Sequence, residues 1–292
     1  MAKGFILYNP LAGHGKCESD TRTLEMLLPE PVEFFDMTRI TNYSAFLAGL
    51  QKEDYLVIAG GDGTVNRFVN ATAGVAISNE VYYFPVGTGN DFAHDLGKEA
   101  LSNPFPIGQY LQALPTVEVK GKHYRFVNGV GYGIDGYCCQ VGDELEKTPG
   151  KKVNYTSIAI QGLLFHYNAT NATVTVDGKV HKFEKVWIAP TMHGRFYGGG
   201  MMPTPAQDRN NADGTLSLMV FHSGGRLKTL CAFPGIFKGE HIKHKDMVTI
   251  LTGREITVEF DRPAPLQIDG ETILDVERYT ARGVRAAEAS CV

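Results

Sequence analysis

Two short stretches combine glycines with a single aspartate, a pattern that suits phosphate and metal chemistry. Residues 60–64 read GGDGT and residues 87–91 read GTGND, and an apolar run precedes each of them. Glycines let backbone N–H groups approach an anion, and a helix that begins there adds partial positive charge. An aspartate fits such a place where a divalent cation lies between its carboxylate and phosphate oxygens. The two loops together predict a site for a nucleotide and a metal ion.

Two familiar phosphate-binding motifs are absent. GGDGTVN lacks the dinucleotide fingerprint, because Asn66 stands where a third glycine belongs. The segment NPLAGHGKC ends like a P-loop, but Pro10 replaces its first glycine and Cys17 replaces the Ser or Thr that would bind magnesium. Taken singly, the two aspartates also fit ordinary roles as a turn residue and a helix N-cap. The prediction therefore depends on both loops occurring together.

The elements that must position these loops alternate between strand and helix patterns. Strands are expected at residues 4–8, 32–38, 55–59 and 81–86, and helices at 24–28, 43–51, 64–72 and from 91 onward. Such alternation predicts βαβ units around a parallel sheet, whose ligands bind beyond the carboxyl ends of the strands. The four loops at those ends read NPLAG, DMT, GGDGT and GTGND, so we expect them to converge.

The pattern changes after residue 115. The stretch TVTVDGKV alternates around an Asp-Gly turn, and more short strands are expected at 185–190, 214–221, 247–253 and 256–260. One helix, residues 153–165, interrupts them. Short strands separated by turn residues predict an all-β domain, either a sandwich or an open barrel.

Composition narrows the class of protein. The 292 residues carry a formal net charge of -4, so there is no basic field to favour nucleic acid. No stretch approaches the roughly 20 apolar residues that span a bilayer. Five cysteines without a C-x-x-C pair are typical of reduced thiols, and we expect a cytoplasmic protein.

The motifs resemble, in order, the catalytic domain of the diacylglycerol kinase family, which includes bacterial soluble lipid kinases and the related sphingosine kinases. The resemblance is carried by NPLAG, GGDGTVN and GTGNDFA, and continues through NGVGYGID, residues 194–218 and IDGE. It implies an α/β nucleotide-binding domain like that of NAD kinases and phosphofructokinases over 1–118. An antiparallel β-sandwich lipid-substrate domain follows over 119–272, and a tail, 273–292, returns to the first domain.

The resemblance also implies an activity, transfer of the γ-phosphoryl group of ATP to a lipid hydroxyl with Mg²⁺ as cofactor. Diacylglycerol is the default substrate and phosphatidic acid the product. Asp62, Asp91 and Glu271 fall on catalytic positions, with Glu271 as general base; an ordinary hairpin residue after Asp269-Gly270 is the alternative. The expected nucleotide site comprises Asn9, Pro10, Gly13, Thr38, Gly60, Gly61, Gly63, Thr64, Asn66, Gly87, Thr88, Gly89 and Asn90. Asp213, with the carbonyls of Asn210 and Thr215, falls on a structural magnesium site.

Arg67 departs from the family pattern. The family usually has glutamate after GGDGTxN, where this chain has Arg67, so a catalytically weak nucleotide- or lipid-binding regulator stays an alternative. So does a kinase of another lipid alcohol or of a soluble substrate, as in NAD kinases. Lys147, Lys151 and Lys152 precede the apolar helix and could seat it on an anionic membrane, unless that helix packs in the core. The sequence also allows a homodimer.

Overall fold

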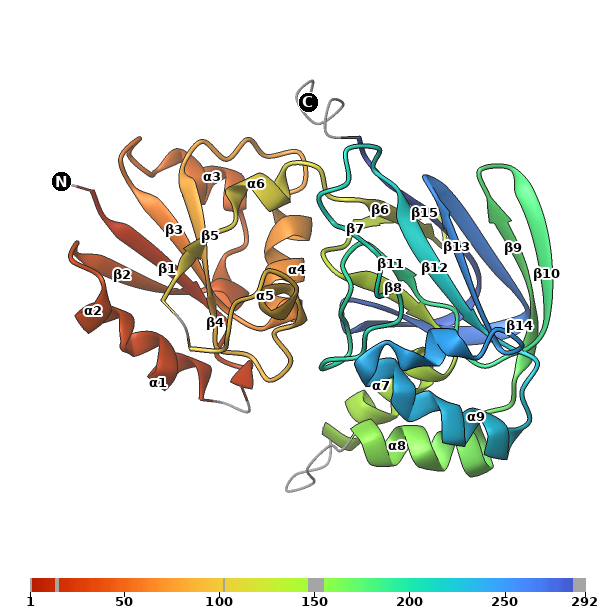
Figure 1. Cartoon of the computed structure of the whole chain (residues 1–292). Helices are drawn as coiled ribbons and strands as arrows, with labels where there is room; N and C mark the ends of the chain where they lie inside the picture. Colours follow the sequence, from red (N-terminus) through yellow and green to blue (C-terminus); the bar gives the residue numbers. More distant parts are fainter. Residues whose placement is uncertain (1, 14–15, 102, 147–154, 286–292) are drawn as a thin grey trace. The chain divides into compact units, whose positions relative to one another are not determined.

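The computed structural model describes residues 2–13, 16–101, 103–146 and 155–285 (Figure 1). The chain divides into two compact units, residues 1–114 and 115–292. The sequence predicted this division after Glu118 instead of Leu114. Glu118 lies inside a strand of the second unit, so the boundary precedes that strand.

The first unit is a five-stranded sheet in the order β2-β1-β3-β4-β5. Its strands are β1 (Gly4–Tyr8), β2 (Val32–Asp36), β3 (Tyr55–Gly60), β4 (Glu80–Pro85) and β5 (Phe105–Pro106). The first four are parallel and β5 is antiparallel to β4. The helices are α1 (Cys17–Arg22), α2 (Leu24–Leu27), α3 (Tyr43–Ala48), α4 (Asp62–Ala71), α5 (Asp91–Asp95) and α6 (Gly108–Leu111), with the 3₁₀ turn η2 (Met37–Arg39). The predicted parallel α/β fold is confirmed.

Helices cover both faces of this sheet because successive strand residues point to opposite sides. Leu24 of α2 packs in one apolar cluster with Ile6 of β1. Phe46 of α3 instead packs edge-on against Phe5 and Phe35, the ring centroids lying 6.2 and 5.1 Å apart. Since Phe5 and Ile6 are neighbours on one strand, the two helices lie on opposite faces.

The second unit is a ten-stranded antiparallel sheet. Its strands are β6 (Thr116–Val119), β7 (Lys122–Arg125), β8 (Gly129–Tyr132), β9 (Thr170–Val176), β10 (Lys179–Val186), β11 (Thr191–Met192), β12 (Leu216–Phe221), β13 (Val248–Gly253), β14 (Glu255–Ile268) and β15 (Glu271–Arg282). The order is β13-β12-β11-β8-β14-β15-β6-β7, and β9 pairs with both β10 and β14. The long strand β14 pairs with β9 over its first residues and with β8 over its last, with register shifts between. The predicted antiparallel β domain is confirmed.

The helices of the second unit differ from the sequence prediction. They are α7 (Ile134–Glu146), α8 (Tyr155–Gln161), the π-helical η3 (Gly162–His166), α9 (Arg226–Ala232) and the 3₁₀ segments η4 (Phe233–Lys238) and η5 (Glu240–Lys243). The predicted helix 153–165 corresponds to α8 and η3, and its first two residues lie outside the described ones. The sequence did not predict α7, because its two glycines lower helix propensity. Gly136 is there for packing, since a Cβ would lie 2.0 Å from the Pro265 carbonyl oxygen of β14.

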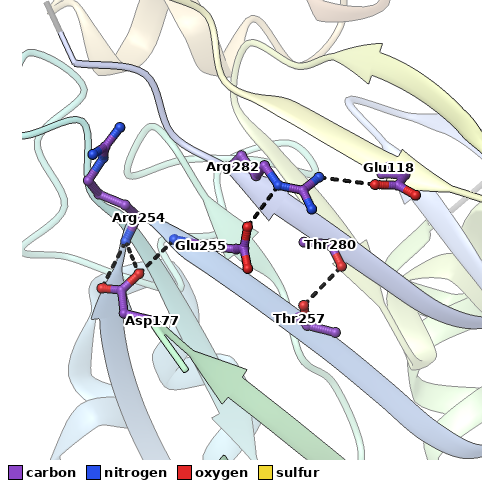
Figure 2. Close-up of polar contacts among 7 residues, drawn as sticks. All are labelled: Glu118, Asp177, Arg254, Glu255, Thr257, Thr280 and Arg282. Atoms are coloured by element: carbon purple, nitrogen blue, oxygen red, sulfur yellow. Dashed lines mark hydrogen bonds and ion pairs between the residues drawn. The ribbon is translucent and has the colours of Figure 1, made fainter. Parts of the chain in front are cut away.

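The C-terminal stretch was expected to return to the first domain, but its described residues lie in the second sheet. Residues 279–282 of β15 pair with β6, and the opposite edge of β15 pairs with β14. Arg282 donates to Glu255 at 2.8 Å and to Glu118 at 3.1 Å (Figure 2). Thr257 of β14 and Thr280 of β15 share a hydrogen bond of 2.9 Å. Three strands are therefore joined by side chains as well as backbone at this end.

Candidate functional site

The carboxyl ends of four parallel strands bring the predicted loops to one edge of the first sheet. The strands β2, β1, β3 and β4 are direct neighbours, and residues 9–13, 36–38, 60–64 and 86–91 follow them or begin at their last residue. The register pairs Asp36 with Tyr8 and Gly60 with Pro85, so neighbouring strands end level. The topology thus places all four predicted loops side by side.

The two glycine loops contact each other through their backbones. A Cβ on Gly87 would lie 2.2 Å from the Gly61 Cα, and one on Gly13 would lie 2.8 Å from the Val86 carbonyl oxygen. The Gly60 carbonyl accepts the N–H groups of Val86 at 3.0 Å and Gly87 at 3.2 Å. These glycines are therefore required by the packing of loop on loop, in addition to any space they leave for a ligand.

Asp62 joins the two loops through its carboxylate. One oxygen accepts the N–H of Asp91 at 2.9 Å and the other accepts the N–H of Phe92 at 2.8 Å. Both donors belong to the first turn of α5, where helical N–H groups have no intrahelical partner. The partial positive charge of that helix end stabilises the carboxylate. Asp62 thus caps α5 from a distant part of the sequence.

Asn90 holds the second loop in its turn. Its backbone is left-handed, with φ of 50°. Its side chain accepts the Gly87 N–H at 3.0 Å and donates to the Gly87 carbonyl at 2.8 Å. The Tyr83 hydroxyl donates to the Gly60 carbonyl at 3.1 Å. Burial, with the neighbouring Asp62 and Asp91 carboxylates, holds the Tyr83 pKa well above its ordinary value, so this donor keeps its proton.

The predicted nucleotide-binding and catalytic residues of the first unit differ in how far they are exposed. Exposed positions are Thr38, Thr88 and Gly89; half-buried ones are Asn9, Pro10, Gly13, Gly61, Asp62, Gly63 and Gly87; buried ones are Gly60, Thr64, Asn66, Asn90 and Asp91. The Thr64 side chain lies against Gly60, and in the described part of the chain its hydroxyl has no hydrogen-bond partner. A bound ligand would meet the exposed and half-buried set, whereas the buried residues shape the loops from beneath.

Arg67, the departure from the family pattern, is exposed on α4. Its charge acts on Asp36 at the end of β2. A hydrogen bond from the Thr38 hydroxyl, with the nearby Arg39 and Arg67 charges, lowers the pKa of Asp36. Thr38 is held by this carboxylate, to which its hydroxyl donates at 2.6 Å. Arg67 therefore adds positive charge beside the second of the four loops.

In the second unit, Glu271 stands at a tight hairpin turn between β14 and β15. The two turn residues have positive φ, 46° for Asp269 and 97° for Gly270. The Asp269 carboxylate accepts three successive backbone N–H groups, those of residues 127, 128 and 129, at 2.5, 2.8 and 2.9 Å. The turn is thereby fixed to the start of β8, and the Glu271 side chain is exposed.

Asp135 is a candidate that the sequence analysis did not single out. It lies in the first turn of α7, is 7% exposed, and accepts a hydrogen bond from the Tyr197 hydroxyl at 3.2 Å. Burial raises its pKa from 3.8 to about 6. Perturbed carboxyl groups of this kind gather at functional sites. Its signal was visible in NGVGYGID, where a carboxylate follows a glycine-rich strand as in the first unit.

The predicted magnesium ligands of the second unit lie on one loop. Asn210 and Asp213 are exposed. The Thr215 carbonyl accepts two amide N–H donors, from Gln207 and Asn211, each at 3.0 Å. A carbonyl oxygen has two lone pairs, so the described conformation uses both of them. Asn211, which the sequence analysis passed over, closes the loop by also accepting the Thr215 N–H at 2.7 Å. Among described residues, no three His, Cys, Asp or Glu gather as for a metal ion.

The segment expected at a membrane packs partly in the core. Ile158 and Leu163 are buried in the cluster beneath α7 and α8, whereas Ile160 and Phe165 are 43% and 72% exposed. Lys147, Lys151 and Lys152 lie outside the described residues. No helix in the described ranges is long and apolar enough to cross a bilayer.

Comparison with known proteins agrees with this architecture. Residues 3–114 match the diacylglycerol kinase catalytic domain, and residues 128–281 match the YegS C-terminal NAD kinase beta sandwich-like domain. A diacylglycerol kinase of Mycobacterium tuberculosis is 26% identical, over 90% of this chain and 86% of its own. A diacylglycerol kinase of Bacillus subtilis is 26% identical, over 93% and 90%. A crystal structure described as a diacylglycerol kinase from Bacillus anthracis superposes with a TM-score of 0.65 at 22% identity, covering 97% and 94%. The chain belongs to the diacylglycerol kinase family of lipid kinases.

Proposed function

We propose that the protein transfers the γ-phosphoryl group of ATP to the hydroxyl of a lipid, and that diacylglycerol is the lipid, giving phosphatidic acid. The family supports a lipid kinase, and one observation in this chain supports the nucleotide's place. Two glycine loops, joined by the Asp62 carboxylate, follow neighbouring strands that end level at the carboxyl edge of a parallel sheet. This is where ligands bind in open α/β sheets.

The first unit binds the nucleotide. The N-cap residue of α4 is Gly61, which has no side chain to cap the helix. The backbone N–H groups in the first turn of α4 are therefore suited to phosphate oxygens. The half-buried Asp62 would supply a hard oxygen ligand of the kind that Mg²⁺ takes alongside phosphates and water, whereas the buried Asp91 would act by shaping the second loop. When bound, the ion would neutralise charge on the transferred group. Arg67 adds positive charge at the same edge, at the position where the family usually has a glutamate.

The second unit binds the lipid and accepts its proton. Glu271 would take the proton of the attacking hydroxyl while that oxygen bonds to the γ-phosphorus and ADP leaves. General-base assistance of this kind is worth roughly 10²–10⁴-fold in rate. The exposure of Glu271 and its rigid turn are compatible with the role. A structural cation bound through Asn210, Asp213 and Thr215 stays a prediction, because the Thr215 carbonyl would have to exchange an amide donor for it.

The decisive experiment is phosphate transfer from γ-labelled ATP against a panel of acceptors. The panel contains diacylglycerol, monoacylglycerol and a sphingoid base in mixed vesicles, and NAD in solution. Labelled phosphatidic acid supports the proposal, and another labelled lipid moves it to that alcohol. Labelled NADP would show that the phosphate acceptor is a soluble substrate and not a lipid. ATP binding without transfer to any acceptor would make the protein a regulator. Vesicles with and without anionic lipid test peripheral membrane association in the same preparation.

A further inference from the structure

A buried polar pair lies directly behind the Glu271 hairpin. Gln267, the next-to-last residue of β14, is 3% exposed. Its side-chain amide lies beside the carboxyl group of Asp135 and acts to lower the pKa of that group against the larger effect of burial. The pair stands over Gly131 of β8, where an added Cβ would lie 1.6 Å from the Asp135 Oδ2 and 2.5 Å from the Gln267 Nε2. Gly131 therefore leaves the space that these two polar groups occupy.

The other end of the same amide holds the hairpin. The Gln267 Oε1 accepts the backbone N–H of Gly270 at 2.7 Å. This contact fixes the orientation of the amide, because an oxygen facing the Gly270 N–H leaves the amino group facing Asp135. Gly270 immediately precedes Glu271. One buried side chain thus connects a carboxyl group in α7 to the residue beside the proposed base.

Side chains hold the turn on both sides. Asp269 adopts the left-handed conformation, with φ of 46°, which an aspartate before glycine favours in a tight hairpin turn. The Asp269 carboxylate ties the turn to β8 on one side. The Gln267 amide ties it to α7 on the other. A buried amide is also costly when its partners are lost, so both contacts favour one conformation of the turn.

We propose that Gln267 is a positioning residue for Glu271, acting through the Gly270 N–H and held in place by Asp135. This inference rests on the proposed function, because it assumes that Glu271 accepts the substrate proton. It goes beyond that function by assigning the hairpin's catalytic geometry to a side chain buried beneath the turn. Loss of alignment at a reacting group costs up to about 100-fold in rate.

The test uses Gln267→Leu, which keeps the size of the side chain and removes both contacts. We expect kcat for lipid phosphorylation to fall between about 10- and 100-fold, with the KM for ATP unchanged. Thr280→Val is the matched control, since it removes one polar contact between the same two strands at their far end (Figure 2). It should lower the melting temperature and leave kcat within about twofold of wild type. Equal kcat losses in both variants would overturn the proposal, because they would reflect general loosening of the sheet.

A double-mutant cycle asks whether Gln267 acts through Glu271. In a Glu271→Gln background, adding Gln267→Leu should change the residual turnover by less than about twofold, because the group being positioned is gone. A full additional loss would overturn the positioning role.

Amide exchange gives a readout that does not depend on activity. The Gly270 N–H should exchange at least about tenfold faster in Gln267→Leu and at the wild-type rate in Thr280→Val. Unchanged Gly270 exchange would overturn the proposal whatever the kinetics. Faster exchange at Gly270 in a protein that phosphorylates no lipid would instead show that the proposed function has failed while the contact stands.

Discussion

The two units fix their candidate residues in different ways. In the first unit, Gly61 and Gly87 touch through their backbones, with no room for a side chain there, and the Asp62 carboxylate joins the same two loops. In the second unit, side chains hold the turn, as Asp269 and Gln267 bind backbone N–H groups around Glu271. The first arrangement is suited to a ligand recognised by backbone N–H groups. The second is suited to titratable groups whose position matters.

Mutations in the two units should therefore have different effects. Changes in the first unit should alter loop geometry, and therefore nucleotide binding and stability together. Changes in the second unit should alter turnover or the dependence of stability on pH while nucleotide binding persists.

Glu271→Gln should reduce lipid phosphorylation by roughly 10²–10⁴-fold, because an amide cannot accept the substrate proton. ATP affinity, measured by calorimetry, should equal that of the wild type. Glu277→Gln is the matched control, an exposed glutamate on the same strand, and it should keep full turnover. Normal turnover in Glu271→Gln would return this residue to the role of an ordinary hairpin residue.

Gly87→Ala should both destabilise the first unit and remove ATP binding. The added methyl would overlap the Gly61 Cα at 2.2 Å, so two loops must separate, at a cost of roughly 3 kcal/mol in unfolding free energy. Gly108→Ala introduces the same methyl in open space at the start of α6, and should be close to neutral. Thermal unfolding and nucleotide titration measure both effects. Tight ATP binding by a stable Gly87→Ala protein would contradict the backbone packing of the loops.

Asp135→Asn should change how stability depends on pH. The folded-state pKa of Asp135 is raised from 3.8 to about 6, so the folded protein holds a proton that the unfolded chain has lost between these values. The contribution of Asp135 to stability is therefore full below pH 4 and lost as the pH rises through 6, by up to about 3 kcal/mol.

The variant lacks this titration. Its unfolding free energy relative to wild type should rise between pH 4 and 7, as measured by urea denaturation. Glu144→Gln removes an exposed carboxyl from the same helix and should leave the wild-type profile. Parallel profiles for wild type and Asp135→Asn would show that Asp135 is ionised in the fold like an ordinary carboxyl.

Asp62→Asn should have the smallest of these effects on stability, about 2 kcal/mol, because an amide can accept only one of the two α5 N–H groups. The loss should appear in thermal unfolding without any nucleotide or metal. Glu53→Gln makes the same carboxyl-to-amide change at an exposed position and should not shift the melting temperature. A chelator should weaken ATP binding in wild type; equal binding with and without it would remove Mg²⁺ from the proposal.

Much of the fold follows from local patterns. Alternating strand and helix signals predicted the parallel sheet, and the Asp177-Gly178 turn predicted the β9–β10 hairpin. The sequence did not predict α7, whose glycines lower helix propensity, because Gly136 is selected by its contact with Pro265 across the fold. Likewise, most of β15 was expected to return to the first domain. The strands with which it pairs are distant in the sequence, and no local pattern indicates them.

For the candidate site, the sequence by itself determined which residue types occupy the strand ends and that glycines and carboxylates occur there together. Only the tertiary structure decided what those carboxylates touch. Asp62 caps α5, 29 residues further along the chain, and Asp135 is buried against Gln267 and Tyr197. Hydrogen-bond partners and burial depend on which segments the fold brings together. A carboxylate's role and its pKa are therefore set by contacts that no spacing in the sequence encodes.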